Sequence, residues 1–446
     1  MTASRVTGSA IVPGLLALKW WIIAALVIGA LWFTARIGSD DSAPAAYDWG
    51  DSPFSGNGPP RTYPEAIKRS DLAIANARSA AAAAPEQWLM HEIHASELLA
   101  RAKLSGSYDD YAAAQQALDA AFKVAVEGSG PHLMQASLDF SMHRLPQAEA
   151  QLAAIDGYAV PPDPGDRAEI AAMRGDIAFY RGDYPAAWAG YDAADALVPG
   201  SASFRRAIFA ARTGDVDQAD AYLVEAEAAY RSPTPQTRSY MELQRGILDL
   251  DRGRLNDAMA HFRKADTLFP GRWLIEEHIA EVLNLQGKTA ESEALYRDIV
   301  RRTGHPEFID ALAGIADARG DKTEARRLYA RSWAIWAKRL TQFPEATYGH
   351  AIDHCIAKGD WPCALRLAQH NHEARPYGEA KIALARALLG HDRAREAQEM
   401  IEQVLVSRWR TPDRHATAAG IFQANGLVEK AAQQRRLARA LNPLVR

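Results

Sequence analysis

A short pattern recurs along this chain about every 34 residues, and it constrains the fold more than any other feature. The pattern is clearest between Gly175 and Pro199, where the turn Gly182-Asp183 separates two alanine-rich segments with helical periodicity. One helix-turn-helix unit of this length cannot bury its apolar stripe alone, so successive units must stack around a continuous core. The repeat therefore predicts an all-α solenoid with an extended concave surface, an architecture that serves binding more often than catalysis.

The turn position can be followed through ten units. It falls on Asp109, His143, Gly182, Gly214, Gly253, Gly287, Gly320, Gly359, Asp392 and Gly426. The steps measure 32 to 39 residues, and the longer ones fit about five extra residues in a connecting loop, which disturbs no helix contact. A small residue follows most turns by five positions, where the paired helices must approach closely: Ala114, Ala148, Ala187, Ala219, Ala258, Ala325, Ala364, Ala397 and Ala431.

These units resemble tetratricopeptide repeats, which are 34-residue helix-turn-helix units with small, aromatic and proline positions. The resemblance covers residues 86–446, with Ser292 in place of the small residue in one unit and Arg435 in place of the aromatic residue in the last. It is most specific at Gly182, Ala187, Tyr191, Ala194 and Pro199, and at Gly246, Gly253, Ala258, Phe262, Ala265 and Pro270. The resemblance implies a right-handed superhelical scaffold of about ten repeats that binds proteins or peptides and needs no cofactor.

An apolar run from Ile11 to Phe33, interrupted only by Lys19, precedes the repeats. About 20 such residues suffice to cross a bilayer, so we expect a single transmembrane helix or signal anchor within 11–35. The alternative is a cleaved signal peptide, with small residues at 42–46 as the processing site. Arg5 and Lys19 precede the span and only Arg36 follows closely, so the positive-inside rule assigns 1–10 to the cytoplasm and the repeats to the periplasm.

Two further segments complete the expected organisation. Gly, Ser, Asp, Pro and Asn dominate 36–62, which we interpret as a flexible linker, and an alanine-rich helix over 63–85 is expected to cap the solenoid of 86–446. Arginine greatly outnumbers lysine, as in GC-rich bacterial genes, so the expected location is a bacterial inner membrane. The net charge of −4 implies no general attraction to nucleic acid.

The two cysteines, Cys355 and Cys363, flank the turn at Gly359 and lie on the two helices of one unit. A disulfide is plausible in an oxidising compartment, and two buried thiols are the alternative. His350, Asp353, His354 and Cys355 with nearby histidines could hold zinc, but their spacing matches no zinc motif. We therefore predict no metal site.

The inward positions of each first helix, about ten, six and three residues before the turn, predict the character of the concave surface. In three successive units they collect mostly acidic and polar residues, namely Glu277, His278, Glu281, Asn284, Asp310, Asp317, His350 and Asp353. Converging carboxylates suit a basic or amine-bearing segment of a partner, although a charged run is often only a solvated face. The family's other mode, capture of a terminal carboxylate, requires Lys, Arg and Asn at these positions and is disfavoured.

No nucleophile-elbow, phosphate-loop or dinucleotide motif is present, so we predict that the chain is not an enzyme. The favoured function is a membrane-tethered adaptor that organises other proteins of the bacterial envelope. One alternative is a periplasmic chaperone-like holder of exported chains, to which exposed Phe179, Tyr180 and Leu250 would contribute. Another is a regulatory subunit of an envelope enzyme complex.

Overall fold

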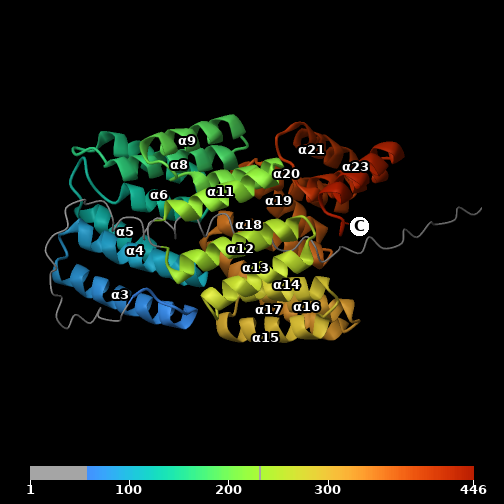
Figure 1. Ribbon diagram of the computed structural model, residues 1–446, viewed down its shortest axis with the longest axis horizontal. Helices are drawn as coiled ribbons and strands as arrows, with labels where there is room; N and C mark the ends of the chain where they lie inside the picture. The colour runs from blue at the N-terminus through green and yellow to red at the C-terminus, as the bar shows by residue number, and fades with distance from the viewer. Residues whose placement is uncertain (1–57, 231–232, 446) are drawn as a thin grey trace, which may run out of the picture.

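The computed structural model describes residues 58–230 and 233–445, and within these residues the chain is helical without a single strand (Figure 1). The predicted cytoplasmic tail, transmembrane helix and nearly all of the predicted linker lie outside the described residues. No described helix is both long enough and apolar enough to cross a membrane.

Ten helical hairpins follow one another. Their helices are α4 (Trp88–Ser105) with α5 (Tyr108–Val124), α6 (His132–Ser141) with α7 (Leu145–Ala154), α8 (Pro164–Tyr180) with α9 (Tyr184–Leu197), α10 (Ser203–Thr213) with α11 (Val216–Ala229), α12 (Pro235–Asp251) with α13 (Leu255–Leu268), α14 (Trp273–Leu285) with α15 (Thr289–Thr303), α16 (Pro306–Ala318) with α17 (Lys322–Gln342), α18 (Pro344–Ala357) with α19 (Trp361–Ala374), α20 (Gly378–Gly390) with α21 (Ala394–Val406), and α22 (Pro412–Ala424) with α23 (Val428–Leu441). The all-α repeat architecture predicted from the sequence is confirmed for the described residues.

One further helix, α3 (Tyr63–Ala83), precedes the hairpins and packs against α4. The Thr62 hydroxyl accepts a hydrogen bond from the Glu65 amide at 3.2 Å, which caps the first turn of α3. The Tyr63 amide donates to the Pro270 carbonyl at 3.1 Å, in the loop between α13 and α14. Helix α3 therefore contacts both the first hairpin and a hairpin in the middle of the chain.

The hairpin turns use a left-handed residue. Most are glycines, and His143 and Asp392 adopt the same conformation with φ of 58° and 60°. In the first hairpin the expected position is wrong: the left-handed residue is Gly106, with φ of 73°, and Asp109 lies inside α5. The cause is Ser107, whose hydroxyl accepts from the Asp110 amide and starts α5 at Tyr108.

The paired helices touch at their small residues. Ala187 and Ala258 are fully buried, and so is Ser292, which replaces alanine in the α14/α15 hairpin. A Cβ atom on Gly246 would clash with the ring of Phe262 on the facing helix. These close approaches explain why the sequence repeats small residues at this position.

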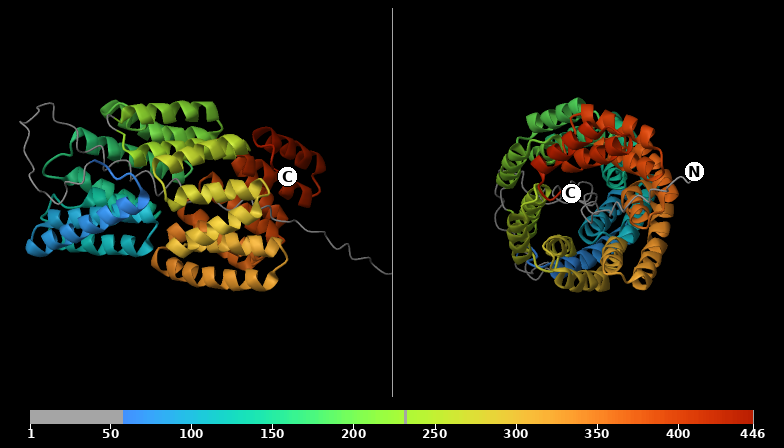
Figure 2. Two further views of the ribbon diagram at one scale, coloured as in Figure 1. Left: turned by 60° about the horizontal axis from the view of Figure 1, so that its bottom comes forward. Right: turned by 90° about the vertical axis from the view of Figure 1, so that its right-hand side faces the viewer.

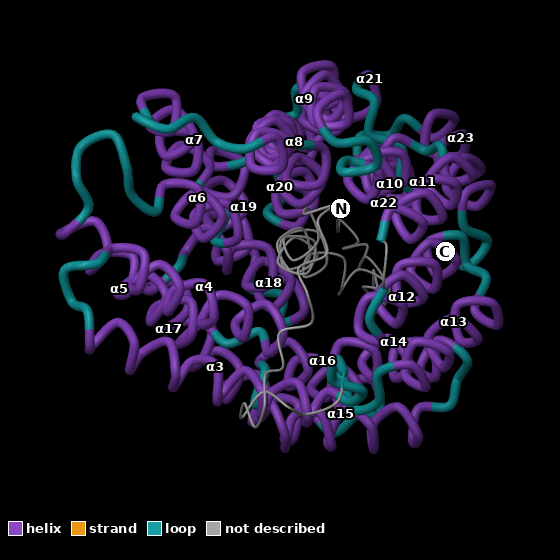
Figure 3. Tube along the Cα trace, turned by 60° about the vertical axis from the view of Figure 1, so that its left-hand side comes forward, coloured by secondary structure: helices purple, strands orange, loops and turns teal. Residues whose placement is uncertain are grey.

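The first helix of each hairpin lies toward the axis of the superhelix, and the second lies outside it (Figure 3). Burial follows this arrangement, since α12 and α14 bury most of their residues whereas α13 and α15 bury four each. The end-on view of Figure 2 shows the hairpins surrounding a common axis.

The second half of the solenoid packs along the first half. The Tyr184 hydroxyl accepts from the Gly378 amide at 3.0 Å, and the Arg410 amide donates to the Arg212 carbonyl at 2.8 Å. Near the carboxyl end, the Asn442 amide group donates to the Asp251 carbonyl at 3.0 Å. Each contact joins a hairpin turn to a segment about 190 to 200 residues further on, so the superhelix is closed on itself rather than extended.

Aromatic side chains fill the interface between these two halves. Tyr180 lies 5.0 Å from Tyr377 between ring centroids, and Phe179 lies 5.8 Å from Trp409. Phe179, Tyr180 and Leu250 are all buried, which corrects the expectation that they stand exposed on the inner face. The sequence could not show this because one repeat does not indicate which distant repeat will contact it.

Candidate functional site

Asp310, a predicted groove residue, is a buried structural carboxylate. Its oxygens accept hydrogen bonds from Trp336 Nε1 at 2.8 Å, from His354 Nδ1 at 2.9 Å and from the Ser332 hydroxyl. These partners come from α17 and α18, so Asp310 on α16 ties neighbouring hairpins together. The expectation that Asp310 lines an open groove is wrong, because its donors enclose it.

Three other predicted residues are only partly buried. Asp317 forms an ion pair with Lys322 at 2.7 Å, across the turn of its own hairpin, with nearly half of its side chain exposed. Asn284 accepts a weak hydrogen bond from Thr289 at 3.4 Å. His350 stacks on Trp336 with ring centroids 5.5 Å apart. His350 is thus linked to Asp310 through Trp336, whereas Asp317 and Asn284 share no hydrogen bond or ion pair with Asp310 among the described residues.

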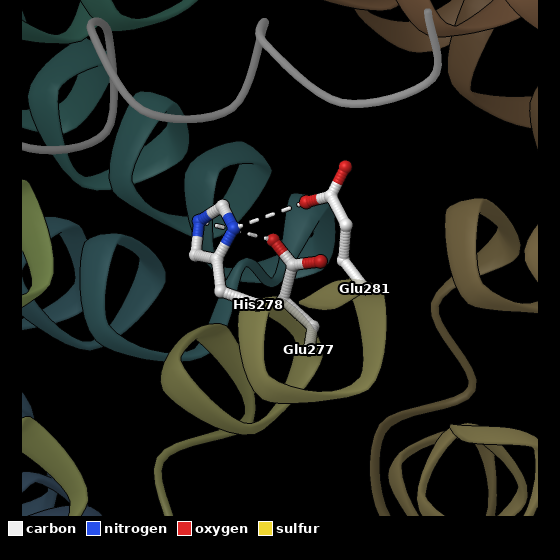
Figure 4. Close-up of side chains that lie close together, drawn as sticks. All are labelled: Glu277, His278 and Glu281. Carbon is white, nitrogen blue, oxygen red and sulfur yellow. Dashed lines mark hydrogen bonds and ion pairs between the residues drawn. The ribbon is translucent and has the colours of Figure 1, made fainter. Parts of the chain in front are cut away.

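The structure does bring Glu277, His278 and Glu281 together on the inner side of α14 (Figure 4). Glu277 lies 3.3 Å from His278 Nε2, and Glu281 lies 3.4 Å from Nδ1. The imidazole also stacks on Phe262, with centroids 5.2 Å apart.

The ligand atoms of these three side chains lie within 4.8 Å of one another, and they form the one group among the described residues that is spaced to hold a metal ion. However, a metal binds one ring nitrogen and draws the other ligands to the same point. Here the two carboxylates lie beside different ring nitrogens of the imidazole. Glu277 and His278 are only 2% and 1% exposed, so the three side chains form a buried group on α14 and not an open acidic surface.

A second group of carboxylates comes from the first helices of four hairpins. We call Asp251 of α12, Asp353 of α18, Glu379 of α20 and Asp413 of α22 the acidic cluster. Asp353 experiences the charges of Glu379, Asp413 and Arg386, while Asp251 experiences those of Glu379, Glu281 and Arg212. The sequence prediction of converging carboxylates from neighbouring helices thus has a counterpart, although only Asp353 was among the predicted residues.

The pKa values of Asp251, Asp353 and Glu379 in the acidic cluster are raised because these three carboxyl groups are removed from water. Burial raises the pKa of Asp251 and of Asp353 to about 7 in each case, and the neighbouring carboxylates add to the shift. The pKa of Glu379 is raised for the same reasons. Arg212 and Arg386 oppose these shifts without cancelling them. Asp353 Oδ2 is buried and has no hydrogen-bond partner within the described part of the chain.

The histidines and Cys355 that could in principle hold zinc do not form a group among the described residues. His354 binds Asp310, and His370 is exposed beside Glu373 at 3.5 Å. Cys355 is joined to Cys363 by a disulfide that links α18 to α19. The two thiols are therefore not metal ligands in this structure, and the disulfide connects the helix that carries Asp353 to its outer partner.

Sequence reasoning missed Asp251, Glu379 and Asp413 for a definable reason. It sampled positions ten, six and three before the turn in three units only. Glu379 and Asp413 each precede their turn by 13 residues and lie in the first helical turn, and Asp251 precedes its turn by two. A scan of the whole first helix in every unit would have found all three.

No protein-family model matches this chain, and no curated protein matches it significantly. Among solved structures, yeast Tom70 is 17% identical, with a TM-score of 0.41, over 84% of this chain and 88% of that chain. A tetratricopeptide repeat protein from Parabacteroides merdae is 17% identical, with a TM-score of 0.33, over 54% and 93%. Pseudomonas aeruginosa pilF is 16% identical, with a TM-score of 0.32, over 48% and 94%. Likenesses of this degree carry no functional inference for this chain.

Proposed function

We propose that this protein is a scaffold, not an enzyme, and that it binds a basic segment of a partner protein at the acidic cluster. The observation that carries the proposal is the mutual electrostatic influence of Asp251, Asp353, Glu379 and Asp413, which come from the first helices of four hairpins. Like charges placed together raise one another's pKa, which costs stability unless a ligand supplies the opposite charge. Lysine or arginine side chains of a partner would supply that charge.

We further propose that residues 11–35 anchor the scaffold in a bacterial inner membrane, with the repeats on the periplasmic side. This rests on the apolar run and the charge asymmetry around it. The disulfide between Cys355 and Cys363 supports an oxidising compartment. In this location the scaffold would recruit another envelope protein.

The chaperone-like holder has less support than the adaptor. A holder of unfolded chains needs exposed apolar surface on its binding face. Phe179, Tyr180 and Leu250 are instead buried. The large apolar residues that are exposed are single residues, such as Val126, Val160 and Val406, or pairs four residues apart on one helix, Leu89 with Ile93 on α4 and Leu437 with Leu441 on α23. No feature of the described residues favours a regulatory subunit over an adaptor.

The test is crosslinking of the tagged full-length protein in its native membrane, followed by mass spectrometry, with a double variant Asp251→Asn/Asp413→Lys. Asp413 tolerates this change because its side chain is 41% exposed. Glu429→Lys, an exposed reversal on the outer helix α23, is the matched control. We expect one dominant partner that is lost from the double variant and retained by the control. Many clients that are indifferent to both variants would contradict the proposal.

A further inference from the structure

A cavity of about 530 Å³ opens at the amino-terminal end of the superhelix, away from the acidic cluster. It is lined by α3, α4, α6 and α8, by the start of α12 and by Arg272, which precedes α14. Its walls are mainly apolar, with Trp88, Leu99, Leu104, Leu133, Met134 and Met173 among them. A cavity of this size and character, with a few placed polar groups, is typical of a small-molecule site.

Arg272 is the most informative residue of this cavity. Arg272 is 5% exposed, and its Nε is buried without a hydrogen-bond partner among the described residues. The guanidinium lies 5.7 Å from the ring centroid of Tyr240, and burial lowers the pKa of Arg272. Because arginine stays charged inside proteins, the cavity holds a positive charge that no described carboxylate pairs.

Two other hydrogen-bond donors line the same cavity. Lys103 is 5% exposed and donates only to the Ser137 hydroxyl, at 3.2 Å, and burial lowers its pKa to about 8. The carboxylate whose charge reaches Lys103 is Glu169, which is itself held by Arg205 at 2.7 Å. The hydroxyl of Tyr240 is buried without a partner among the described residues.

Carboxylates also line the cavity, but they do not neutralise these cations. Glu92 and Asp166 have interactions of their own, Glu169 is held by Arg205 at 2.7 Å, and Glu97 forms no ion pair with Lys103 or Arg272 in the described part of the chain. A buried cation without an anion is costly, and such a group is usually retained for a ligand. The missing partner is therefore an anion.

We propose that this cavity binds a single-chain amphiphilic anion of the fatty-acid class. Its carboxylate would accept hydrogen bonds from Arg272 and Tyr240, with Lys103 as a second cation, and its alkyl chain would pack on the leucines and methionines of α4, α6 and α8. A peptide segment suits the cavity less well, because its backbone groups need hydrogen bonds and Gln236 is the one side-chain amide in the lining. The ligand is independent of the partner proposed for the acidic cluster.

The test uses the full-length protein in lipid nanodiscs and a photo-activatable 16-carbon carboxylic acid, with labelled peptides identified by mass spectrometry. The same chain with a trimethylammonium head group tests the charge. Arg272→Gln removes the cation, Ala100→Phe fills the cavity without changing a charge, and Arg297→Gln is the matched control on the exposed face of α15. We expect labelling of α4 and α12 that unlabelled palmitate competes away.

The expected result is that labelling falls about tenfold in Arg272→Gln and in Ala100→Phe and is unchanged in Arg297→Gln, since one hydrogen bond to a charged group contributes about that factor. Arg272→Gln should also raise the melting temperature of the unliganded protein, because an unpaired buried charge is removed. Equal labelling by the cationic analogue would overturn the proposal. So would labelling that persists in Ala100→Phe, a result that remains informative even if Arg272→Gln fails to fold.

Discussion

The acidic cluster and the amino-terminal cavity share helix α12, yet the buried charged groups that distinguish them have opposite sign. Helix α12 contributes Tyr240 to the cavity and, at its other end, Asp251 to the acidic cluster. Arg272 in the cavity precedes α14, and Glu281 near the acidic cluster lies in its later part. Helix α14 therefore has a cation at its start and a carboxylate in its later part, and α12 has a buried hydroxyl in its first half and a carboxylate at its end. The repeated hairpins form the scaffold, and one or two residues on each helix determine which ligands the acidic cluster and the cavity can bind.

Two of these residues oppose the helix dipole. Arg272 is the N-cap residue of α14, where the dipole is positive, and Asp251 is the last residue of α12, where it is negative. Each placement costs about 0.3 to 1 kcal/mol relative to a residue of the opposite sign. In contrast, Lys103 at the end of α4 is placed favourably. Residues that stand at the unfavourable end of a helix are candidates for function rather than stability.

The largest expected effect is on the free energy of unfolding, and it distinguishes the buried carboxylate of Asp310 from the carboxylates of the acidic cluster. Asp310→Ala leaves the buried donors of Trp336, His354 and Ser332 without an acceptor, so the free energy of unfolding should fall by about 3 to 5 kcal/mol. Asp413→Ala should change it by less than about 0.5 kcal/mol, as for other partly exposed positions. Urea unfolding followed by circular dichroism measures both. Equal losses would mean that the two carboxylates do not differ in role.

The next effect concerns the disulfide, which belongs to the hairpin of Asp353. Replacing Cys355 and Cys363 with alanine should lower the free energy of unfolding by about 2 to 3 kcal/mol, because the short loop is no longer closed in the unfolded chain. The double variant should weaken binding at the acidic cluster and leave the cavity unchanged. Thiol labelling of the denatured, unreduced protein checks the bond. Two free sulfhydryls would show that it does not form.

The smallest expected effect is a pH dependence of opposite sign in the two regions. Asp353 has a folded pKa of about 7, above its unfolded value near 4, so its contribution to stability is full below pH 4 and is lost as the pH rises through 7. Lys103 has a folded pKa of about 8, below its unfolded value near 10.4, so its contribution is lost as the pH falls through 8. For each residue the free energy of unfolding changes by at most about 1.4 kcal/mol per pH unit.

Two neutral variants isolate these slopes. The free energy of unfolding of Asp353→Asn minus that of the wild type should increase as the pH rises from 6 to 8. The same difference for Lys103→Met should increase as the pH falls from 9 to 7. Urea titrations at each pH give both differences. Slopes of the same sign in the two variants would contradict the assignment of opposite charge to the two regions.

Much of the hairpin architecture could be predicted from the sequence, because turns and small residues repeat at fixed spacing and report local packing. Gly106 was missed since a serine cap moved the helix start, a purely local effect. The inner surface was harder to predict. Asp310 and Asp353 occupy inward positions of their helices, yet Trp336 and His354 enclose Asp310. Which carboxylates remain available depends on contacts between hairpins, and these leave no periodic signal.

The cavity was not predicted at all. Lys103 lies six residues before the expected turn at Asp109, which is an inward position of its helix. Arg272 lies in a loop between hairpins, outside the inward positions of any first helix. Their significance depends on the absence of a nearby carboxylate, which a linear sequence does not reveal. Sequence patterns thus give the position of a charge, whereas its partner, or lack of one, is known only in three dimensions.

The contacts that join Tyr184 to Gly378 and Asp251 to Asn442 have a mechanical consequence. A solenoid whose units touch only their neighbours can stretch like a spring and can fray from its ends. Here a hairpin near the carboxyl end cannot move away without breaking the aromatic interface to a hairpin early in the chain. The molecule should therefore resist extension and lose its structure in one cooperative event, and a pulling force should meet one high barrier where an open solenoid shows many low ones.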